Sequence, residues 1–363
     1  MKKNNYKKLI IASSGSGGHV YPGIALAREL EKHGYDITFF IVDNTISMEI
    51  LNNSNFKYIK FNMSGMPKKF SIKFLKFLFT FCLNLIKALI KIKKIDPIIV
   101  IGMGGYITVP IIIAAKILKK ITFIHEQNVI PGKANILLSK IVNKTFISFK
   151  QSKKYINNAF FSGCPIRKEI FLVSRITSFQ KFGFNNRIPI VLVVGGSLGF
   201  ISLNQIIFNS LIELSVNNKL QVLHITGLNK DFFSIKRKTK NVSNYKVFQY
   251  IHNIEDAYTI SNIIICRSGA STIFEMNALE KAAILIPYSK ATDNHQYWNA
   301  KAIENDYRKI IEENDITKKK LINILFSIIK EDSNRKKTIY SKSFAQELIA
   351  EEIIKELNYI CCL

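Results

Sequence analysis

The chain has 363 residues, 48% of them hydrophobic, and a formal net charge of +26. This length exceeds one ordinary hydrophobic core and predicts about two domains. The five cysteines form no Cys-x-x-Cys pair, which argues against a zinc site or a disulfide framework and indicates reduced thiols in a cytosolic protein. The apolar run at residues 9–12 is too short for a signal peptide.

The positive charge is concentrated in the first half of the chain. Residues 1–163 hold 25 Lys and Arg against 7 Asp and Glu, whereas residues 164–363 hold 27 against 19. This excess predicts a polyanionic partner for the first half. A non-enzymatic nucleic-acid binder would also use such charge, but the chain has one Trp and no basic motif with interleaved exposed aromatics. We therefore expect no nucleic-acid partner.

The chain opens with a predicted strand, a glycine-rich turn and a helix. Residues 9–12 form the strand, residues 13–18 the turn, and the helix ends at Gly34 before a strand at residues 36–42. This βαβ order predicts a parallel sheet. The turn lacks the Gly-Lys-Ser/Thr of a P-loop and the third glycine of a dinucleotide fingerprint, so an ATPase or dehydrogenase is not expected.

A second glycine turn, at residues 102–106, follows a predicted strand at residues 98–101. A helix from Pro110 and a strand at residues 122–124 come next, and then a polar run, His-Glu-Gln-Asn, at residues 125–128. Open α/β sheets hold ligands at the carboxyl ends of their strands, which makes this run a candidate site. The structural alternative leaves one or two of these side chains capping the next helix.

The strand–glycine turn–helix pattern then restarts at residues 190–204. The predicted fold class is therefore α/β, with two Rossmann-like parallel-sheet domains facing each other across a cleft. We expect an N-terminal domain at residues 1–163, a second domain at 164–340, and a C-terminal helix within 341–363 that packs back toward the first domain.

Residues 263–300 resemble a nucleotide-sugar site. A buried strand at 263–265 leads into a small-residue turn at 268–272, whose amides and helix dipole could hold a phosphate. Glu275 could accept hydrogen bonds from both ribose hydroxyls, and a polar loop at 293–296 could meet the sugar. Thr272 and Glu275 also have the spacing of a capping box, in which Glu275 only satisfies the helix start. Arg267 and the polar loop favour the nucleotide.

Six motifs then closely resemble the MurG family of glycosyltransferases (family 28): GSGGHVYPG, GMGGY, HEQN, VVGGSLG, RSGAST-x-x-E and DNHQYWNA. They occur in order over nearly the whole chain. The resemblance implies a GT-B fold and an inverting hexosyltransferase of peptidoglycan synthesis. Its donor would be UDP-N-acetylglucosamine, and its acceptor the C4 hydroxyl of undecaprenyl-diphospho-N-acetylmuramoyl-pentapeptide (lipid I to lipid II). Another GT-B glycolipid transferase or a UDP-N-acetylglucosamine 2-epimerase is the alternative, and HEQN argues against both.

The resemblance also implies roles for individual residues. The first domain would take the acceptor and the second the UDP-sugar. The chain departs from the family pattern at Leu198, Ile201, Cys164 and the Thr108-Val109 pair. Leu198 lacks a side-chain amide, which weakens the polar contacts expected from the third glycine turn, at residues 195–199. The implied substrate-binding residues are Ser16, Gly17, Gly18, Tyr106, Asn128, Arg167, Ser197, Ile251, Ala270, Ser271, Thr272, Ile273, Phe274, Glu275 and Gln296.

Inverting transfer needs a base for the acceptor hydroxyl and a positive group for the leaving diphosphate. His19 is the predicted base, because an imidazole of unperturbed pKa ~6.5 suits the task, and Glu126 is the second choice. The alternative for His19 is a helix-start residue that bonds the backbone. No Asp-x-Asp cluster is present, so we expect no metal or cofactor and assign the diphosphate to a helix N-terminus and Arg167.

The segment from Phe70 to Lys94 predicts an amphipathic helix with a wide apolar face that includes Phe77 and Phe81. Residues 68–94 hold eight lysines and no acid, which suits an anionic lipid surface. We expect peripheral binding at the cytoplasmic face of the bacterial plasma membrane, with this helix in the interface. The alternative is a buried helix whose lysines face water.

Overall fold

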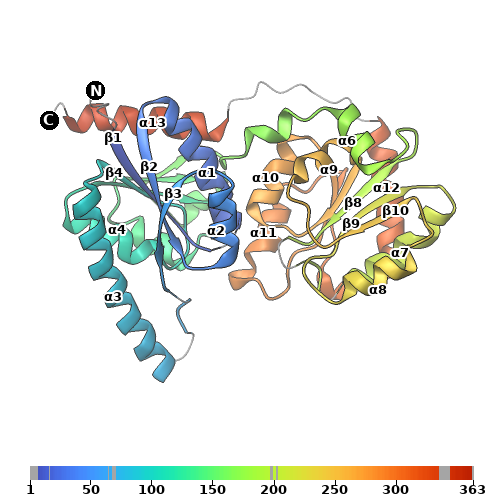
Figure 1. The fold of residues 1–363 in the computed structure, drawn as a ribbon, viewed down its shortest axis with the longest axis horizontal. Coiled ribbons are helices and arrows are strands. Elements are labelled where there is room, and N and C mark those ends of the chain that lie inside the picture. The colour runs from blue at the N-terminus through green and yellow to red at the C-terminus, as the bar shows by residue number, and fades with distance from the viewer. Residues whose placement is uncertain are drawn as a thin grey trace. The chain divides into compact units, whose positions relative to one another are not determined.

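The computed structural model describes residues 7–15, 17–63, 65–67, 71–196, 199–201, 203–334 and 344–361. They belong to two compact units. Unit 1 is Met1–Arg167 with Ser341–Leu363, and unit 2 is Lys168–Tyr340. Each unit is built on one parallel sheet covered by helices (Figure 1).

The sheet of unit 1 has the strand order β3-β2-β1-β4-β5-β6-β7 with every neighbouring pair parallel. Its central strands are continuous apolar runs because helices cover both faces, and Leu9, Ile10 and Ile11 have no exposed surface. The strands are β1 (Lys7–Ser13), β2 (Tyr35–Val42), β3 (Lys57–Phe61), β4 (Ile99–Gly102), β5 (Ile121–Glu126), β6 (Lys144–Ile147) and β7 (Ala159–Phe161).

The last helix of the chain belongs to unit 1. Ile349 and Ile353 are buried in the same core cluster as Leu30 of the first helix, and the two helices lie side by side (Figure 1). Lys144 pairs with Glu352 on this helix at 2.7 Å. The helices of unit 1 are α1 (Gly17–Lys32), α2 (Thr45–Asn52), α3 (Ile72–Ile95), α4 (Thr108–Ile117), α5 (Lys133–Leu138) and α13 (Ala345–Cys361), with a 3-10 turn at Lys150–Lys154.

Unit 2 repeats this architecture with the strand order β10-β9-β8-β11-β12-β13, again parallel throughout. The strands are β8 (Ile190–Val194), β9 (Gln221–Ile225), β10 (Tyr245–Phe248), β11 (Ile263–Cys266), β12 (Ala282–Leu285) and β13 (Arg308–Ile310). The helices are α6 (Arg175–Phe182), α7 (Asn204–Val216), α8 (Asp231–Lys238), α9 (Ile254–Ile260), α10 (Ala270–Ala278), α11 (His295–Lys301) and α12 (Lys318–Asn334), with 3-10 turns at Lys168–Phe171, Thr292–Asn294 and Glu313–Asp315.

The predicted α/β class with two parallel-sheet domains is confirmed. In both units a strand, a glycine turn and a helix recur where the sequence pattern predicted them, with β1 leading into α1 and β8 leading toward α7. One boundary was wrong. The turn predicted at residues 268–272 is shorter than expected, because the helix after β11 already begins at Ala270.

Candidate active site

In unit 1 the two glycine turns pack on each other at the carboxyl edge of the sheet. The amide of Ser14 donates to the carbonyl of Gly104 at 3.2 Å. Gly105 has φ +85°, and a Cβ there would lie 2.2 Å from the Cβ of Ser14. Only glycine fits such a close approach with positive φ. The two turns thus form one surface at the ends of β1 and β4.

His19 lies against this surface from the first turn of α1. Its Nδ1 is 3.0 Å from Oε1 of Gln127, which follows β5. A Cβ on Gly104 would lie 2.9 Å from Cε1 of His19, so the second glycine turn leaves room for the imidazole. The fold therefore brings together the predicted base, the second glycine turn and the HEQN run.

Glu126, the alternative base, is buried at the end of β5 with 2% exposure. Its Oε1 accepts from the amide and side chain of Asn128 at 2.8 and 3.1 Å. Its Oε2 accepts from the amide of Gly132 at 3.0 Å and from Nδ2 of Asn135 at 2.7 Å. A carboxylate has about four acceptor positions, so these four donors occupy it. Glu126 holds the loop that leads into α5.

The other predicted residues of unit 1 lie along the same edge of the sheet or next to it. Gly17 and Gly18 open α1. The guanidinium of Arg167 stacks on the ring of Tyr21, also on α1, at 4.5 Å. Tyr106 is the last residue of the second glycine turn, and its ring meets Phe77 of α3 edge-on at 6.3 Å. Tyr106 thus links the turn to that long helix.

In unit 2 the turn between β11 and α10 has the form of an anion site. Gly269 is the N-cap, and the amide of Ile273 makes the first helical bond to its carbonyl at 3.0 Å. The amides of Ala270, Ser271 and Thr272 therefore precede the helical ladder, where no helical acceptor exists. A Cβ on Gly269 would meet no atom within 4 Å, so the space in front of the turn is open.

This geometry excludes the alternative in which Thr272 and Glu275 form a capping box. Thr272 lies inside α10, three residues after the N-cap, so Glu275 is in the second turn and not at N3. Glu275 is 5% exposed. Ile273 is fully buried in the core of unit 2, so its side chain packs behind the turn, away from solvent. Phe274 is half-buried.

Arg267, whose position before the turn favoured a nucleotide site, is held by other groups of unit 2. Its Nη2 pairs with Oε1 of Glu313 at 2.8 Å, and its Nη1 donates to the carbonyls of Ile286 and Pro287. Oε2 of the same Glu313 accepts from the amide of Ser289 at 2.9 Å. Arg267 therefore ties β11 to the loop that follows β12.

That loop leads to the last predicted residue, Gln296, at the start of α11. Its Oε1 accepts from the amide of Tyr288 at 3.0 Å, which leaves its amide group as the donor available to a sugar. Ile251, in the loop after β10, is half-buried against the core cluster of unit 2 that contains Ile264 and Leu285. Ser16, Ser197 and the departure Leu198 lie outside the described residues.

The other departures have simple structural settings. Thr108 starts α4, and its hydroxyl donates to the carbonyl of Gly105 at 2.7 Å. Cys164 is buried, and Ile201 is exposed.

Sequence reasoning missed Gln127 and Asn135 as functional neighbours. Gln127 stood in the polar run already singled out, whereas Asn135 gave no signal because its contact with Glu126 arises from the loop fold.

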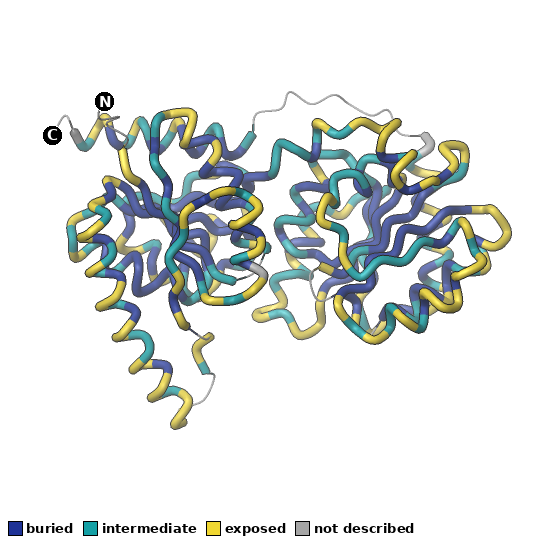
Figure 2. Tube along the Cα trace, in the orientation of Figure 1, coloured by how far each residue is buried: buried dark blue, intermediate teal, exposed yellow. Residues whose placement is uncertain are grey.

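The long helix α3 has two apolar faces. Phe77, Ala88 and Ile92 are buried against unit 1. Opposite them, exposed apolar side chains extend over the length of the helix, and Figure 2 shows α3 as largely exposed. The expectation that Phe77 belongs to a lipid-facing surface was therefore wrong, because the fold uses that residue for packing. The exposed apolar residues of α3 are Ile72, Leu75, Leu78, Phe79, Leu83, Ile86 and Ile90.

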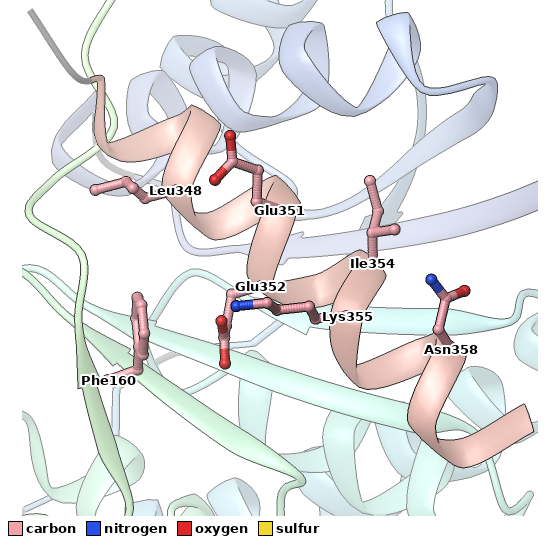
Figure 3. Close-up of a pocket in the computed structure, with 7 residues that line it drawn as sticks. All are labelled: Phe160, Leu348, Glu351, Glu352, Ile354, Lys355 and Asn358. Atoms are coloured by element: carbon pink, nitrogen blue, oxygen red, sulfur yellow. The ribbon is translucent and has the colours of Figure 1, made fainter. Parts of the chain in front are cut away.

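A cavity of about 450 Å³ lies elsewhere in unit 1, between Phe160 of β7 and the face of α13 that carries Glu352 and Lys355 (Figure 3). None of the predicted site residues line it, and Glu352 already pairs with Lys144. Within the described part of the chain, no cluster of three His, Cys, Asp or Glu side chains is placed to hold a metal ion.

Comparison with known proteins assigns the chain to an enzyme family. Residues 9–147 match the glycosyltransferase family 28 N-terminal domain, and residues 190–356 match its C-terminal domain. A UDP-N-acetylglucosamine–N-acetylmuramyl-(pentapeptide) pyrophosphoryl-undecaprenol N-acetylglucosamine transferase from Wigglesworthia glossinidia brevipalpis is 36% identical, covering 98% of both chains. The transferase of the same name from Finegoldia magna is 32% identical, covering 96% of this chain and 97% of its own.

Solved structures share the fold. MurG of Acinetobacter baumannii superposes with a TM-score of 0.70 at 24% identity, covering 96% of this chain and 99% of that one. A UDP-GlcNAc 2-epimerase from Neisseria meningitidis, solved with UDP-GlcNAc bound, has a TM-score of 0.68 at 15% identity, covering 96% and 100%. At these identities the likeness concerns the fold alone.

Proposed function

The chain belongs to glycosyltransferase family 28, and we propose that it transfers N-acetylglucosamine from UDP-N-acetylglucosamine to the C4 hydroxyl of an undecaprenyl-diphospho-N-acetylmuramoyl-pentapeptide. It is a hexosyltransferase by family. The hydroxyl attacks the anomeric carbon, uridine diphosphate leaves from the opposite face, and the configuration inverts. Relatives of this name span almost the whole chain, which supports the acceptor as well as the donor.

The observation that carries the proposal is the β11–α10 turn of unit 2. Its three leading amides and the positive end of the α10 dipole suit the diphosphate of the donor. Glu275, one turn further on, suits the ribose hydroxyls, and the Gln296 amide suits the sugar. The amides of Ala270, Ser271 and Thr272 contribute through the backbone, whereas the side chain of Ile273 supports the turn from the core.

Unit 1 supplies the base. We assign the role to His19, because Glu126 already accepts four hydrogen bonds from its own loop. An imidazole at this place removes the proton from the acceptor hydroxyl as the new bond forms. Asn128 and Arg167, near the same edge, are assigned to the donor sugar and diphosphate.

Transfer of label from radiolabelled UDP-N-acetylglucosamine to a lipid I analogue tests the function directly. We expect transfer by the purified chain, and we expect it to persist in excess EDTA, because the α10 N-terminus stabilises the leaving diphosphate without a divalent ion. Donor hydrolysis or epimerisation without transfer would refute the acceptor assignment. Activity lost with EDTA and restored by magnesium would refute the ion-free mechanism alone.

We further propose that α3 binds the membrane that carries the acceptor, at its cytoplasmic face. Ile72, Phe79 and Ile90 are 86%, 65% and 61% exposed, which is unusual for large apolar side chains on one helix face. Exposed lysines that include Lys73 and Lys76 flank this face. Such a helix suits an anionic interface, where each cation near the surface adds about 1 kcal/mol. Among the described residues, no helix has the length and apolarity to cross a bilayer.

Replacing Phe79 and Leu83 by serine should release the protein from phosphatidylglycerol vesicles in a co-sedimentation assay. Both side chains are exposed, so thermal stability should change by no more than about 0.5 kcal/mol each. High salt should weaken binding of the parent, because exposed charges are screened.

The matched control replaces Leu228 and Phe233, two exposed apolar residues of unit 2, by serine. This control removes similar apolar surface and should leave binding intact. Replacing Phe77 by serine should instead cost about 3–5 kcal/mol of folding free energy, since it is buried. Equal release by the unit 2 control, or binding that ignores lipid charge, would contradict the assignment of α3.

A further inference from the structure

A buried chain of hydrogen bonds leads to His19 from beneath the sheet edge. Nδ1 of His19 is 3.0 Å from Oε1 of Gln127. Nε2 of Gln127 lies 2.8 Å from the carbonyl of Met103 and 3.1 Å from Nδ1 of His125. Nε2 of His125 lies 3.0 Å from the carbonyl of Gly163. His125 and Gln127 are 0% and 1% exposed, so the bonds of Gln127 to Met103 and to His125 are shielded from water.

The direction of every proton in this chain follows from its two carbonyl ends. A carbonyl only accepts, so Gly163 places a proton on Nε2 of His125. Burial lowers the pKa of His125 to about 4, so the ring is neutral at neutral pH and its Nδ1 is an acceptor. The Gln127 amide group then donates both of its protons, one to His125 and one to the carbonyl of Met103.

This assignment leaves one possibility for the last bond. Oε1 of Gln127 has no proton, so the bond to His19 requires a proton on Nδ1 of His19. In a neutral imidazole the other nitrogen, Nε2, then carries the lone pair. A general base needs its lone pair on the nitrogen that meets the substrate, and the opposite tautomer would offer a donor instead.

We propose that Gln127 is a positioning residue that holds His19 in the Nδ1–H tautomer, and that His125 orients Gln127 for this task. Gly104 completes the arrangement, because a side chain there would displace the imidazole from Gln127. The inference rests on the proposed role of His19 as the base and adds how the base is prepared. It assigns a function to His125 and Gln127, the two HEQN residues that neither bind substrate nor hold the loop before α5.

The tautomer can be measured on the intact chain. The protein has six histidines, so long-range proton–nitrogen NMR spectra of histidine-labelled protein can be assigned by the signal that the His19→Ala variant loses. At a pH where His19 is neutral, we expect the Nδ1–H pattern in the parent. An Nε2–H pattern would overturn the proposal, and this measurement needs no variant of Gln127.

The variant Gln127→Met keeps the volume of the side chain and removes the acceptor. We expect the His19 signal to shift toward the Nε2–H tautomer. We also expect kcat to fall about 10- to 100-fold while KM for UDP-N-acetylglucosamine stays within about twofold. If Gln127 had a purely structural role, its replacement would leave the tautomer of His19 unchanged.

Gln221→Met in unit 2 is the matched control. Gln221 is equally buried, and its amide group donates to the carbonyls of Asn185 and Ile188 at 2.7 and 3.1 Å. This control should lose comparable stability and keep both the His19 tautomer and kcat. If His19→Ala keeps its turnover, the base assignment fails. If it does not, but Gln127→Met keeps the parent tautomer and kcat, only the positioning role fails.

Discussion

Replacing His19 by alanine should lower turnover about 100-fold or more, because it removes the group that takes the proton of the acceptor hydroxyl. Donor affinity should change little, since the donor contacts are assigned largely to the β11–α10 turn of unit 2. Steady-state kinetics with both substrates varied would show a loss in kcat with KM for UDP-N-acetylglucosamine almost unchanged.

The control for this variant is His33→Ala. His33 is exposed just beyond the other end of α1, so its loss removes an imidazole from the same helix without touching the site. It should retain the turnover of the parent. Near-normal turnover in His19→Ala would move the base to another residue, and Glu126 would then have to give up hydrogen bonds that hold its loop.

The second large effect is expected at Glu275. If its carboxylate accepts the ribose hydroxyls, Glu275→Ala should weaken UDP binding by ~1.5–3 kcal/mol, the range for a hydrogen bond to a charged group. That range corresponds to about a 10- to 150-fold rise in Kd, which isothermal titration calorimetry resolves. Glu275→Gln keeps one acceptor oxygen and should lose less.

Thr272→Ala separates this role from a purely structural one. Because Gly269 is the N-cap of α10, Thr272 does not cap the helix, and its replacement should leave the melting temperature nearly unchanged. A fall in the melting temperature of Glu275→Ala with unchanged UDP affinity would contradict the ribose assignment and make Glu275 a packing residue of the second turn.

The sequence by itself determined the architecture of both units and the turns that carry the site. Strands such as β8, with its unbroken apolar run, and glycine turns such as the one at residues 102–106 are local features, set by side-chain periodicity and by the backbone freedom of glycine. The motifs were also sufficient to identify the family, because they consist of chemically specific residues at the ends of the strands.

Only the tertiary structure decided which polar side chains are bound by hydrogen bonds within the protein and which apolar side chains are buried. Phe77 and Phe79 are two residues apart with equal hydrophobicity, yet Phe77 is 7% exposed and Phe79 is 65% exposed. The difference arises because one face of α3 packs against the rest of unit 1. Likewise, Glu126 and Gln127 are neighbours in one motif. The strand end directs Glu126 into its own loop and Gln127 toward His19, over a separation of 108 residues that no local pattern encodes.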